Sequence, residues 1–324
     1  MEENKILLET QALTKYFKTK RGFLHAVDEV DLTLPAGETL GVVGESGCGK
    51  STLGRTILKL IEPTGGKIIF DGEDISGYSP KQMKRLREDM QIIFQDPYSS
   101  IDPRKTVAQA IAEPLIISKR YSNKQEMYDY VRKMMDTVGL AQRLFDAYPH
   151  ELDGGRRQRI GVARALAMNP KLIICDEPVS ALDVSIQAQI LNLLMDLQDE
   201  MGLAYLFITH DLSVVKHIAD NIMVMYMGRC IEKAPANELF RNPVHPYTQA
   251  LLASIPVPSS SMRTKKLKVI RGEVTSPIEP KPCCRFAARC PYATDLCRSQ
   301  EPKLEKNSDG HDVACFHQET TAQK

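Results

Sequence analysis

A glycine-rich segment near the start of the chain has the composition and spacing of a phosphate-binding loop. The letters GESGCGKS, from Gly44 to Ser51, fit the pattern GxxxxGK[ST]. Glycines allow the backbone to turn several N–H groups toward phosphate oxygens, and a following helix adds the positive end of its dipole. We expect Lys50 to bridge the terminal phosphates and the Ser51 hydroxyl to coordinate Mg²⁺. The segment therefore predicts a site for a nucleoside triphosphate with magnesium.

The elements expected around this loop are the ones that such a motif requires. An apolar strand is predicted at Thr39–Val43, and a helix is predicted from about Ser51. The alternative, a glycine-rich turn without a ligand, would not need a strand before it and a helix after it.

A pair of carboxylates follows a second predicted buried strand. The segment Leu172–Cys175 is apolar, and Asp176 and Glu177 come directly after it. Ligands bind at the carboxyl ends of strands in open α/β sheets. We expect Asp176 to hold Mg²⁺ through water and Glu177 to act as the general base, or to position water, for attack on the γ-phosphate. The alternative is an ordinary solvated strand end.

The segment Leu152–Arg156, with the letters LDGGR, resembles the Leu-Ser-Gly-Gly-Gln signature of ABC-type ATPases. With the phosphate loop and the Asp-Glu pair in the same order, the chain resembles the ABC transporter ATPase family from about Lys5 to Ala253. The resemblance implies an α/β fold: a P-loop NTPase (RecA-like) ABC cassette with an antiparallel β subdomain and an inserted helical subdomain.

The resemblance also implies roles for single residues. Gln95 matches the glutamine that contacts Mg²⁺ or the attacking water, Asp183 ends the loop that crosses the dimer interface, and His210 matches the switch histidine that bonds the γ-phosphate. Phe17 matches the aromatic residue that stacks on adenine, with Tyr16 as the alternative. The implied nucleotide contacts are Phe17, Tyr16, Gly44, Glu45, Ser46, Gly47, Cys48, Gly49, Lys50, Ser51, Thr52, Gln95, Leu152, Asp153, Gly154, Gly155, Arg156, Asp176 and Asp183; the implied magnesium ligands are Ser51, Gln95 and Asp176, and the catalytic residues are Glu177 and His210.

The signature differs from the family pattern at two positions. In the family, the signature of one subunit closes the ATP site of its partner, and here Asp153 replaces the serine and Arg156 the glutamine. A carboxylate 4 Å from a phosphate charge is repelled by about 1 kcal/mol in water and about 4 kcal/mol at an effective dielectric of 20. We expect the site that this signature completes to be impaired, with Arg156 offsetting part of the repulsion. A heterodimer with unequal sites is therefore favoured over a homodimer.

Composition and charge limit the location and partners of the chain. Its 324 residues, 43% of them hydrophobic, suffice for one large domain and an appendage. The net charge of +1 lacks the basicity typical of nucleic-acid binding, so no nucleic-acid partner is expected. No signal peptide and no apolar stretch near the ~20 residues of a membrane span are evident. We expect a peripheral protein on the cytoplasmic face of the membrane.

The coarse secondary structure agrees with a nucleotide-binding layer interrupted by helices. A helical pattern extends from about residue 97 to 168 and includes a stripe, Tyr128, Val131, Met134, Met135 and Val138, that we interpret as core. The signature is expected to begin a helix at 156–168. We predict a nucleotide-binding domain at 1–255 with a helical insert at about 97–168, and a linker and cysteine-rich extension at 256–324. The predicted strands are Lys67–Phe70, Met90–Phe94, Lys171–Cys175, Ala204–Thr209 and Asn221–Tyr226.

Five of the eight cysteines lie in the tail, at positions 283, 284, 290, 297 and 315. A cytosolic chain does not keep such residues as disulfides, so their clustering suggests a metal centre with thiolate ligands. No C-x₂-C zinc knuckle is present. Cys48 lies in the phosphate loop, whereas Cys175 and Cys230 are expected to be buried in strands.

Three segments narrow the resemblance to the ATPase subunits of dipeptide/oligopeptide permeases. They are Phe94–Arg104, Asn242–Tyr247 and the tail from Cys284 to Cys315. Members of this subfamily can carry a 4Fe-4S cluster, whose ligands would match Cys284, Cys290, Cys297 and Cys315, leaving Cys283 over. Zinc and free thiols are the alternatives.

The sequence thus predicts an ATP-hydrolysing subunit of an importer for peptides or similar solutes such as nickel. Its expected cofactors are ATP, Mg²⁺ and a 4Fe-4S cluster, or Zn²⁺ in its place. Its expected partners are a second ABC ATPase, two integral membrane permease subunits and, indirectly, an extracytoplasmic solute-binding protein. Two rivals remain: a regulatory clamp that binds ATP with little hydrolysis, favoured by Asp153, and a soluble ABC protein of DNA repair or translation.

Overall fold

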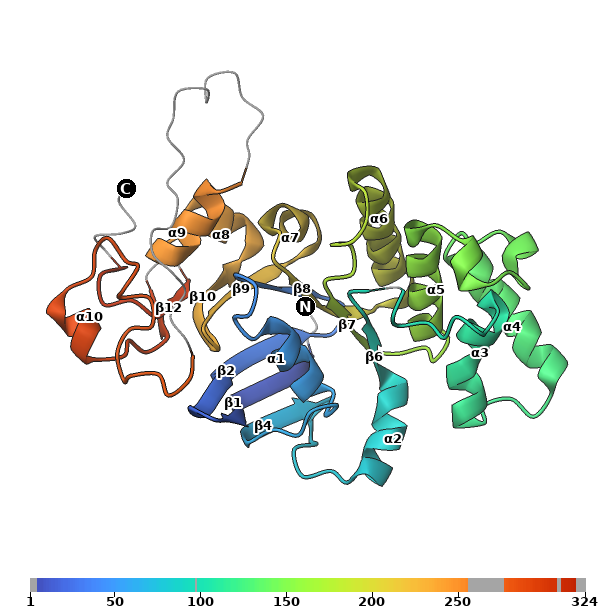
Figure 1. Cartoon of the computed structure of the whole chain (residues 1–324), viewed down its shortest axis with the longest axis horizontal. Helices are drawn as coiled ribbons and strands as arrows, with labels where there is room; N and C mark the ends of the chain where they lie inside the picture. The colour runs from blue at the N-terminus through green and yellow to red at the C-terminus, as the bar shows by residue number, and fades with distance from the viewer. Residues whose placement is uncertain (1–4, 97, 256–276, 308–309, 319–324) are drawn as a thin grey trace, which may run out of the picture. The chain divides into compact units, whose positions relative to one another are not determined.

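The computed structural model describes residues 5–96, 98–255, 277–307 and 310–318. The predicted linker beyond Ile255 lies outside these residues. The chain divides into two compact units, each formed around its own elements (Figure 1). The first unit combines the chain up to Gly77 with the chain from Phe207 onward, and the second unit is Tyr78–Leu206.

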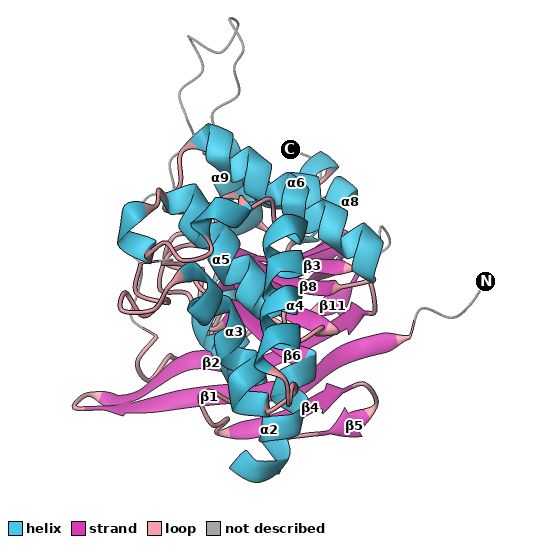
Figure 2. Ribbon diagram, turned by 90° about the vertical axis from the view of Figure 1, so that its right-hand side faces the viewer, coloured by secondary structure: helices cyan, strands magenta, loops and turns pink. Residues whose placement is uncertain are grey.

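A long antiparallel hairpin dominates one sheet of the first unit (Figure 2). Strand β1 (Ile6–Thr19) pairs with β2 (Gly22–Pro35) and, on its other edge, with β4 (Gly65–Phe70), which pairs with β5 (Glu73–Asp74). From Val30 onward, buried and exposed residues alternate along β2, as expected for a sheet with one face against a core. This sheet confirms the antiparallel β subdomain expected from the resemblance.

The other sheet of the first unit positions the phosphate loop. Strand β3 (Thr39–Val43) is buried throughout and runs parallel to β9 (Asn221–Tyr226). Strand β10 (Arg229–Pro235) pairs antiparallel with β9 and with β12 (Asp312–Val313), so the tail adds strands to the sheet; β12 also pairs with β11 (Glu305–Lys306). The helices of this unit are α1 (Lys50–Ile57), α7 (Leu212–Ile218), α8 (Ala236–Arg241), α9 (Pro246–Ala253) and α10 (Asp295–Ser299).

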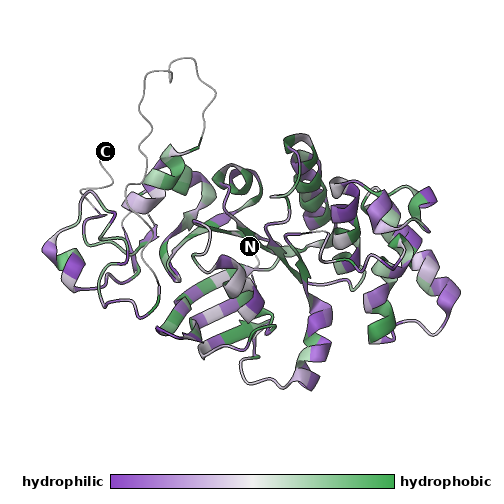
Figure 3. Ribbon diagram, viewed as in Figure 1, coloured by the Kyte–Doolittle hydropathy of each residue, from purple (hydrophilic) through white to green (hydrophobic). Residues whose placement is uncertain are grey.

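The second unit is mainly helical and contains two parallel strands, β6 (Met90–Ile93) and β7 (Leu172–Asp176). Strand β8 (Ala204–Thr209) begins in this unit and ends in the first. Mostly charged residues make α2 hydrophilic in Figure 3, whereas α6 is largely hydrophobic. The helices are α2 (Pro80–Asp89), α3 (Val107–Ser118), α4 (Lys124–Thr137), α5 (Gly154–Leu166) and α6 (Val184–Met201), with short 3-10 turns η1 (Gln142–Leu144) and η2 (Pro149–Glu151).

The predicted strands and the helical segment are confirmed, with small shifts at their ends. In the predicted core stripe, Val131, Met135 and Val138 are fully buried, while Tyr128 and Met134 are partly exposed. Cys175 and Cys230 are buried in β7 and β10, as expected. Within the described residues, no helix is both long and apolar enough to cross a bilayer.

Candidate functional site

The phosphate loop connects β3 to α1, and close backbone contacts determine its path. A Cβ atom on Gly44 would lie 2.2 Å from the Met225 carbonyl oxygen, and one on Gly49 would lie 1.9 Å from the Ala26 carbonyl oxygen. The Gly49 φ of +108° adds a conformation that L side chains rarely adopt. Only glycine fits at these positions, so the spacing of the motif follows from steric limits as well as from phosphate chemistry.

Lys50 is held directly over this loop. Its ammonium donates to the carbonyl oxygens of Gly44 at 2.8 Å and of Glu45 at 3.0 Å, and the residue is only 4% exposed. The neighbouring Cys48 is also buried, and burial raises the pKa of its thiol. A cationic group therefore lies at the loop beside a neutral thiol, which suits the binding of a phosphate.

Tyr16 and Phe17 have different surroundings on β1. The Tyr16 hydroxyl donates to the Asp28 carboxylate, and its ring stacks on His25 at 3.9 Å between centroids. Phe17 is half-buried, with the Lys15 ammonium 4.9 Å from its ring centroid. The contacts of Tyr16 account for that residue as part of the framework, which favours Phe17 as the ring that meets a base.

Asp28, which receives the Tyr16 hydroxyl, is the centre of a buried ionic cluster. Burial alone would raise its pKa, but hydrogen bonds from Tyr16, His25 and Arg285 outweigh burial and lower the pKa to about 2. Its side chain is 4% exposed. The carboxylate is therefore ionised and tied to the tail through Arg285.

In the second unit the chain brings two predicted catalytic-site residues together. Glu177 follows β7, and the Gln95 side-chain amide donates to its carboxylate at 2.9 Å although the two are far apart in sequence. Glu177 also has a φ of +50°, which is rare for a residue with a side chain and is typical of positions where neighbouring structure determines the backbone. Asp176 is the buried last residue of β7.

The altered signature forms the start of α5. Asp153 is the N-cap residue, and its carboxylate accepts the Arg156 backbone N–H at 2.8 Å. The Arg156 guanidinium also lies 3.4 Å from the Asp153 carboxylate. Serine and aspartate are equally suited to capping a helix, so the substitution preserves the local structure. Gly155 lies in a tight contact, because a Cβ there would lie 2.7 Å from the Ile186 side chain, which would have to shift.

The remaining predicted residues lie at element ends. Leu152 is buried, and Asp183 is the N-cap residue of α6 without a side-chain capping bond. His210 follows β8 and is exposed. Gln95, Asp176, Glu177 and the signature belong to the second unit, whereas His210 and the phosphate loop belong to the first.

Four tail cysteines line one pocket, together with His245 and His317. They are Cys284, Cys290, Cys297 and Cys315, and Cys283 is not among the lining residues. Burial, followed by smaller effects of the neighbouring thiols, raises the pKa of Cys284 to about 12 and that of Cys315 to about 11. Four thiols are the donor set of an iron–sulfur cluster. Within the described ranges, however, no group of three His, Cys, Asp or Glu side chains is arranged to hold a metal ion, so the geometry does not support the predicted metal centre.

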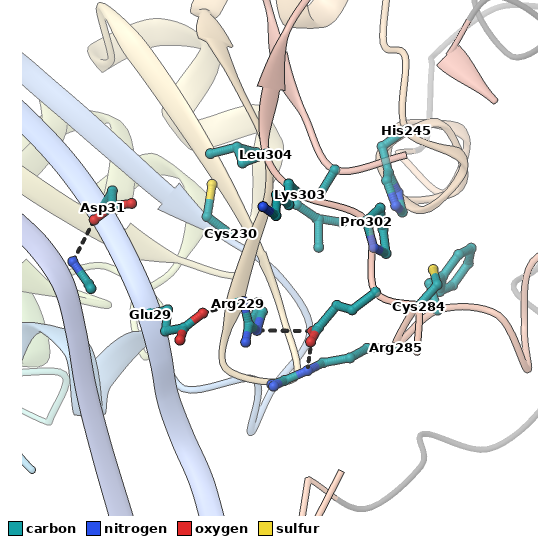
Figure 4. A pocket seen from close by; sticks show the side chains of 15 residues that line it. Glu29, Asp31, Arg229, Cys230, His245, Cys284, Arg285, Pro302, Lys303 and Leu304 are labelled. Carbon is teal, nitrogen blue, oxygen red and sulfur yellow. Dashed lines mark hydrogen bonds and ion pairs between the residues drawn. The ribbon is translucent and has the colours of Figure 1, made fainter. Parts of the chain in front are cut away.

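A larger cavity of about 440 Å³ lies where the tail packs on β2 and β10 (Figure 4). Arg229 and Arg285 point toward each other there and share the Glu301 carboxylate at 3.0 and 3.3 Å. Sequence reasoning missed these arginines and Asp28, because nothing in their spacing indicates that they meet.

Comparisons with known proteins agree with this geometry. The ABC transporter family model matches residues 27–180, and the model for the C-terminal region of oligopeptide/dipeptide transporters matches residues 231–297. The chain is 49% identical to the dipeptide transport ATP-binding protein DppF of Haemophilus influenzae, over 98% of both chains. This chain belongs to that family of ABC transporter ATP-binding subunits. It is also 49% identical to the oligopeptide transport ATP-binding protein OppF of Salmonella typhimurium, over 98% of this chain and 97% of that one.

Solved structures of ABC cassettes match the cassette part of this family member. The structure of cbiO1 from Clostridium perfringens, part of the ABC transporter complex cbiONQ, has a TM-score of 0.66 at 30% identity and covers 73% of this chain and 91% of that one. A dimeric structure of the bacterial ABC transporter cassette MJ0796 also has a TM-score of 0.66, at 28% identity over 71% of this chain and 99% of that one. The predicted fold class and ATPase activity are confirmed by these relationships.

Proposed function

We propose that this ABC ATPase energises the import of dipeptides or oligopeptides. The observation that carries the proposal is the similarity to DppF and OppF proteins along nearly the whole chain, tail included. Related importers carry nickel or sugars, and the solute does not contact the ATPase. Uptake of labelled dipeptides, oligopeptides and Ni²⁺ by vesicles containing the assembled transporter distinguishes these substrates. Uptake of Ni²⁺ without peptide uptake would overturn the peptide assignment.

The residues expected from the sequence supply the parts that ATP hydrolysis requires. Lys50 neutralises phosphate charge, and Glu177, oriented by the amide of Gln95, accepts a proton from the attacking water or positions it. His210 is assigned to the γ-phosphate by its match to the family. Ser51, Gln95 and Asp176 offer the oxygen ligands that Mg²⁺ prefers, and bound Mg²⁺ would neutralise charge on the phosphates.

We also propose that the chain acts in a heterodimer with unequal ATP sites. The Asp153 side chain is 59% exposed at the start of α5, and its negative charge is only partly balanced by Arg156. Opposite a partner's triphosphate this charge is unfavourable. Little Mg²⁺-ATPase activity of the chain alone, with strong activity in a pair with a second ABC ATPase, is the expected result. Full activity alone would contradict the unequal sites, and activity of the pair that survives Glu177→Gln in this chain would favour the regulatory clamp, which leaves hydrolysis to its partner.

We propose that the tail cysteines bind a 4Fe-4S cluster that stabilises the fold of the tail. The proposal rests on the chemistry of the four thiols that line one pocket, Cys284, Cys290, Cys297 and Cys315, and not on a preformed metal geometry; zinc or free thiols are the alternatives. Iron, sulfide and zinc analysis with a visible spectrum of anaerobically purified protein tests it. A spectrum without charge-transfer bands and an absence of iron would exclude the cluster.

We also propose two domains in this chain and an assembly with membrane subunits. The cassette would occupy 1–255, with the extension at 256–324. The chain would bind two membrane permease subunits at the cytoplasmic face of the membrane and would serve a solute-binding protein indirectly. Co-purification of the tagged chain with permease subunits from solubilised membranes tests this placement.

A further inference from the structure

Glu45, the second residue of the phosphate loop, is held by groups from outside the loop. The Arg289 guanidinium forms a two-pronged ion pair with its carboxylate, at 2.8 Å and 3.0 Å. The Glu45 backbone N–H donates to the Tyr247 hydroxyl at 2.8 Å. Both the side chain and the backbone of this loop residue are therefore fixed by the C-terminal part of the chain.

Arg289 is itself rigidly placed. Its side chain is 6% exposed, and it donates to the Tyr226 hydroxyl at 3.3 Å. Tyr226 and Tyr247 contact each other at 4.7 Å between ring centroids, and the Phe286 ring meets each of them edge-on at 5.4 Å. The aromatic cluster beneath the arginine limits its freedom, so the ion pair loses little side-chain entropy on forming.

The segment Cys284–Cys290, a series of turns that we call the tail turn, contains both Arg289 and Phe286. It also contains Arg285, which binds the Asp28 carboxylate and the Met227 carbonyl oxygen. The tail turn therefore contacts the phosphate loop through Arg289 and β2 through Arg285. Figure 4 shows Arg285.

The ion pair between Arg289 and Glu45 affects nucleotide binding because Glu45 carries a negative charge. A carboxylate on a loop that binds a triphosphate repels the ligand, and the effect is larger in a partly buried site than in water. The Glu45 side chain is 26% exposed, so solvent screens it only partly. A bidentate arginine neutralises the carboxylate and also fixes its orientation.

We propose that Arg289 is a positioning residue for ATP: it neutralises Glu45 and holds the phosphate loop, so that the tail turn increases the affinity for nucleotide. This inference does not depend on what the tail cysteines bind, because it rests on an ion pair and an aromatic cluster. It assigns the tail a role in the nucleotide site of the same chain.

The test measures binding of a fluorescent ATP analogue to the full chain, with wild-type binding established first. Arg289→Ala should raise Kd about tenfold in the chain alone, and KM about tenfold in the pair with a second ABC ATPase, with a much smaller change in kcat. Arg298→Ala is the matched control, because its ion pair with Asp295 is on the surface, and it should bind as wild type. The tenfold defect should shrink as salt is raised, because charge repulsion is screened.

A second pair of variants separates charge from folding. Removing the Glu45 charge in the Arg289→Ala background (E45Q/R289A) should restore most of the lost affinity. Arg289→Gln, which removes the positive charge but keeps a polar side chain, should also raise Kd, and this variant keeps the test valid if Arg289→Ala fails to fold. Wild-type affinity in Arg289→Ala or Arg289→Gln, or a double variant as weak as the single one, would overturn the proposal.

Discussion

The phosphate loop and the signature segment both have glycines at the start of a helix, yet they differ in how much change they accept. In the phosphate loop, Gly44 and Gly49 lie against backbone carbonyl groups, and Lys50 is buried. In the signature, Asp153 is exposed and serves as a helix cap, a role that several polar residues fill. The loop is therefore determined by steric contacts, whereas the signature is determined by a cap and a small-residue contact. An altered letter in the signature is compatible with an intact fold in a way that an altered loop glycine is not.

The largest effect is expected on ATP hydrolysis at the site that includes Glu177. Glu177→Gln should reduce phosphate release by the assembled complex by about 10²–10⁴-fold, because the proposed general base is lost, while ATP binding is retained. Phosphate release and nucleotide binding are measured on the same preparation. If most of the turnover survives, the site built on Glu177 is not the active one.

Adding a methyl group to the phosphate loop tests the steric side of the comparison. Gly49→Ala places Cβ 1.9 Å from a backbone oxygen, so we expect a loss of nucleotide binding and a destabilisation of more than about 2 kcal/mol. Gly47→Ala is the control, because Gly47 also has a positive φ but nothing lies within 4 Å of its Cβ position. Equal loss in both variants would show that backbone strain, and not the contact, limits the loop.

The buried Asp28 near the phosphate loop should contribute pH-dependent stability. Its pKa is lowered from an ordinary 3.8 to about 2, so the ionised form stabilises the folded state. This contribution is present above about pH 4 and is lost as the pH falls toward 2. Asp28→Asn should therefore lower the free energy of unfolding by about 2 kcal/mol at pH 7, with a difference that shrinks below pH 4. Denaturant unfolding of both proteins at several pH values measures this; a constant difference would contradict the assignment.

The exposed Asp153 should contribute little to stability and more to activity. Asn caps helices as well as Asp does, so Asp153→Asn should change the free energy of unfolding by less than about 0.5 kcal/mol. Removing the charge should raise the Mg²⁺-ATPase activity of the chain alone several-fold, since one repulsive contact is lost. Asp153→Ala, which also removes the cap, should cost about 1 kcal/mol. Unchanged activity in Asp153→Asn would mean that the carboxylate does not oppose a phosphate.

Much of the fold could be predicted because several of its strands are short runs of mainly apolar residues. Met90–Ile93, Leu172–Asp176 and Asn221–Tyr226 are examples in which local composition and structure agree. The hairpin of β1 and β2 was not predicted from its residues, although apolar and polar residues alternate along β2 from Val30 onward, which is a strand signal. The short tail strands were not predicted either, because β12 forms by pairing with β10 and β11 by pairing with β12, which no local pattern indicates.

The sequence by itself was enough to predict the nucleotide site, because phosphate binding demands particular residue types at particular spacings. Glycine, lysine and serine in the loop, and the carboxylates after β7, are chemical requirements that can be recognised in order along the chain. Only the tertiary structure decided that Gln95 donates to Glu177, that Asp153 caps α5 and that Arg289 pairs with Glu45. These contacts depend on distances between residues remote in sequence, and such distances are set by packing of the whole fold and by no local pattern.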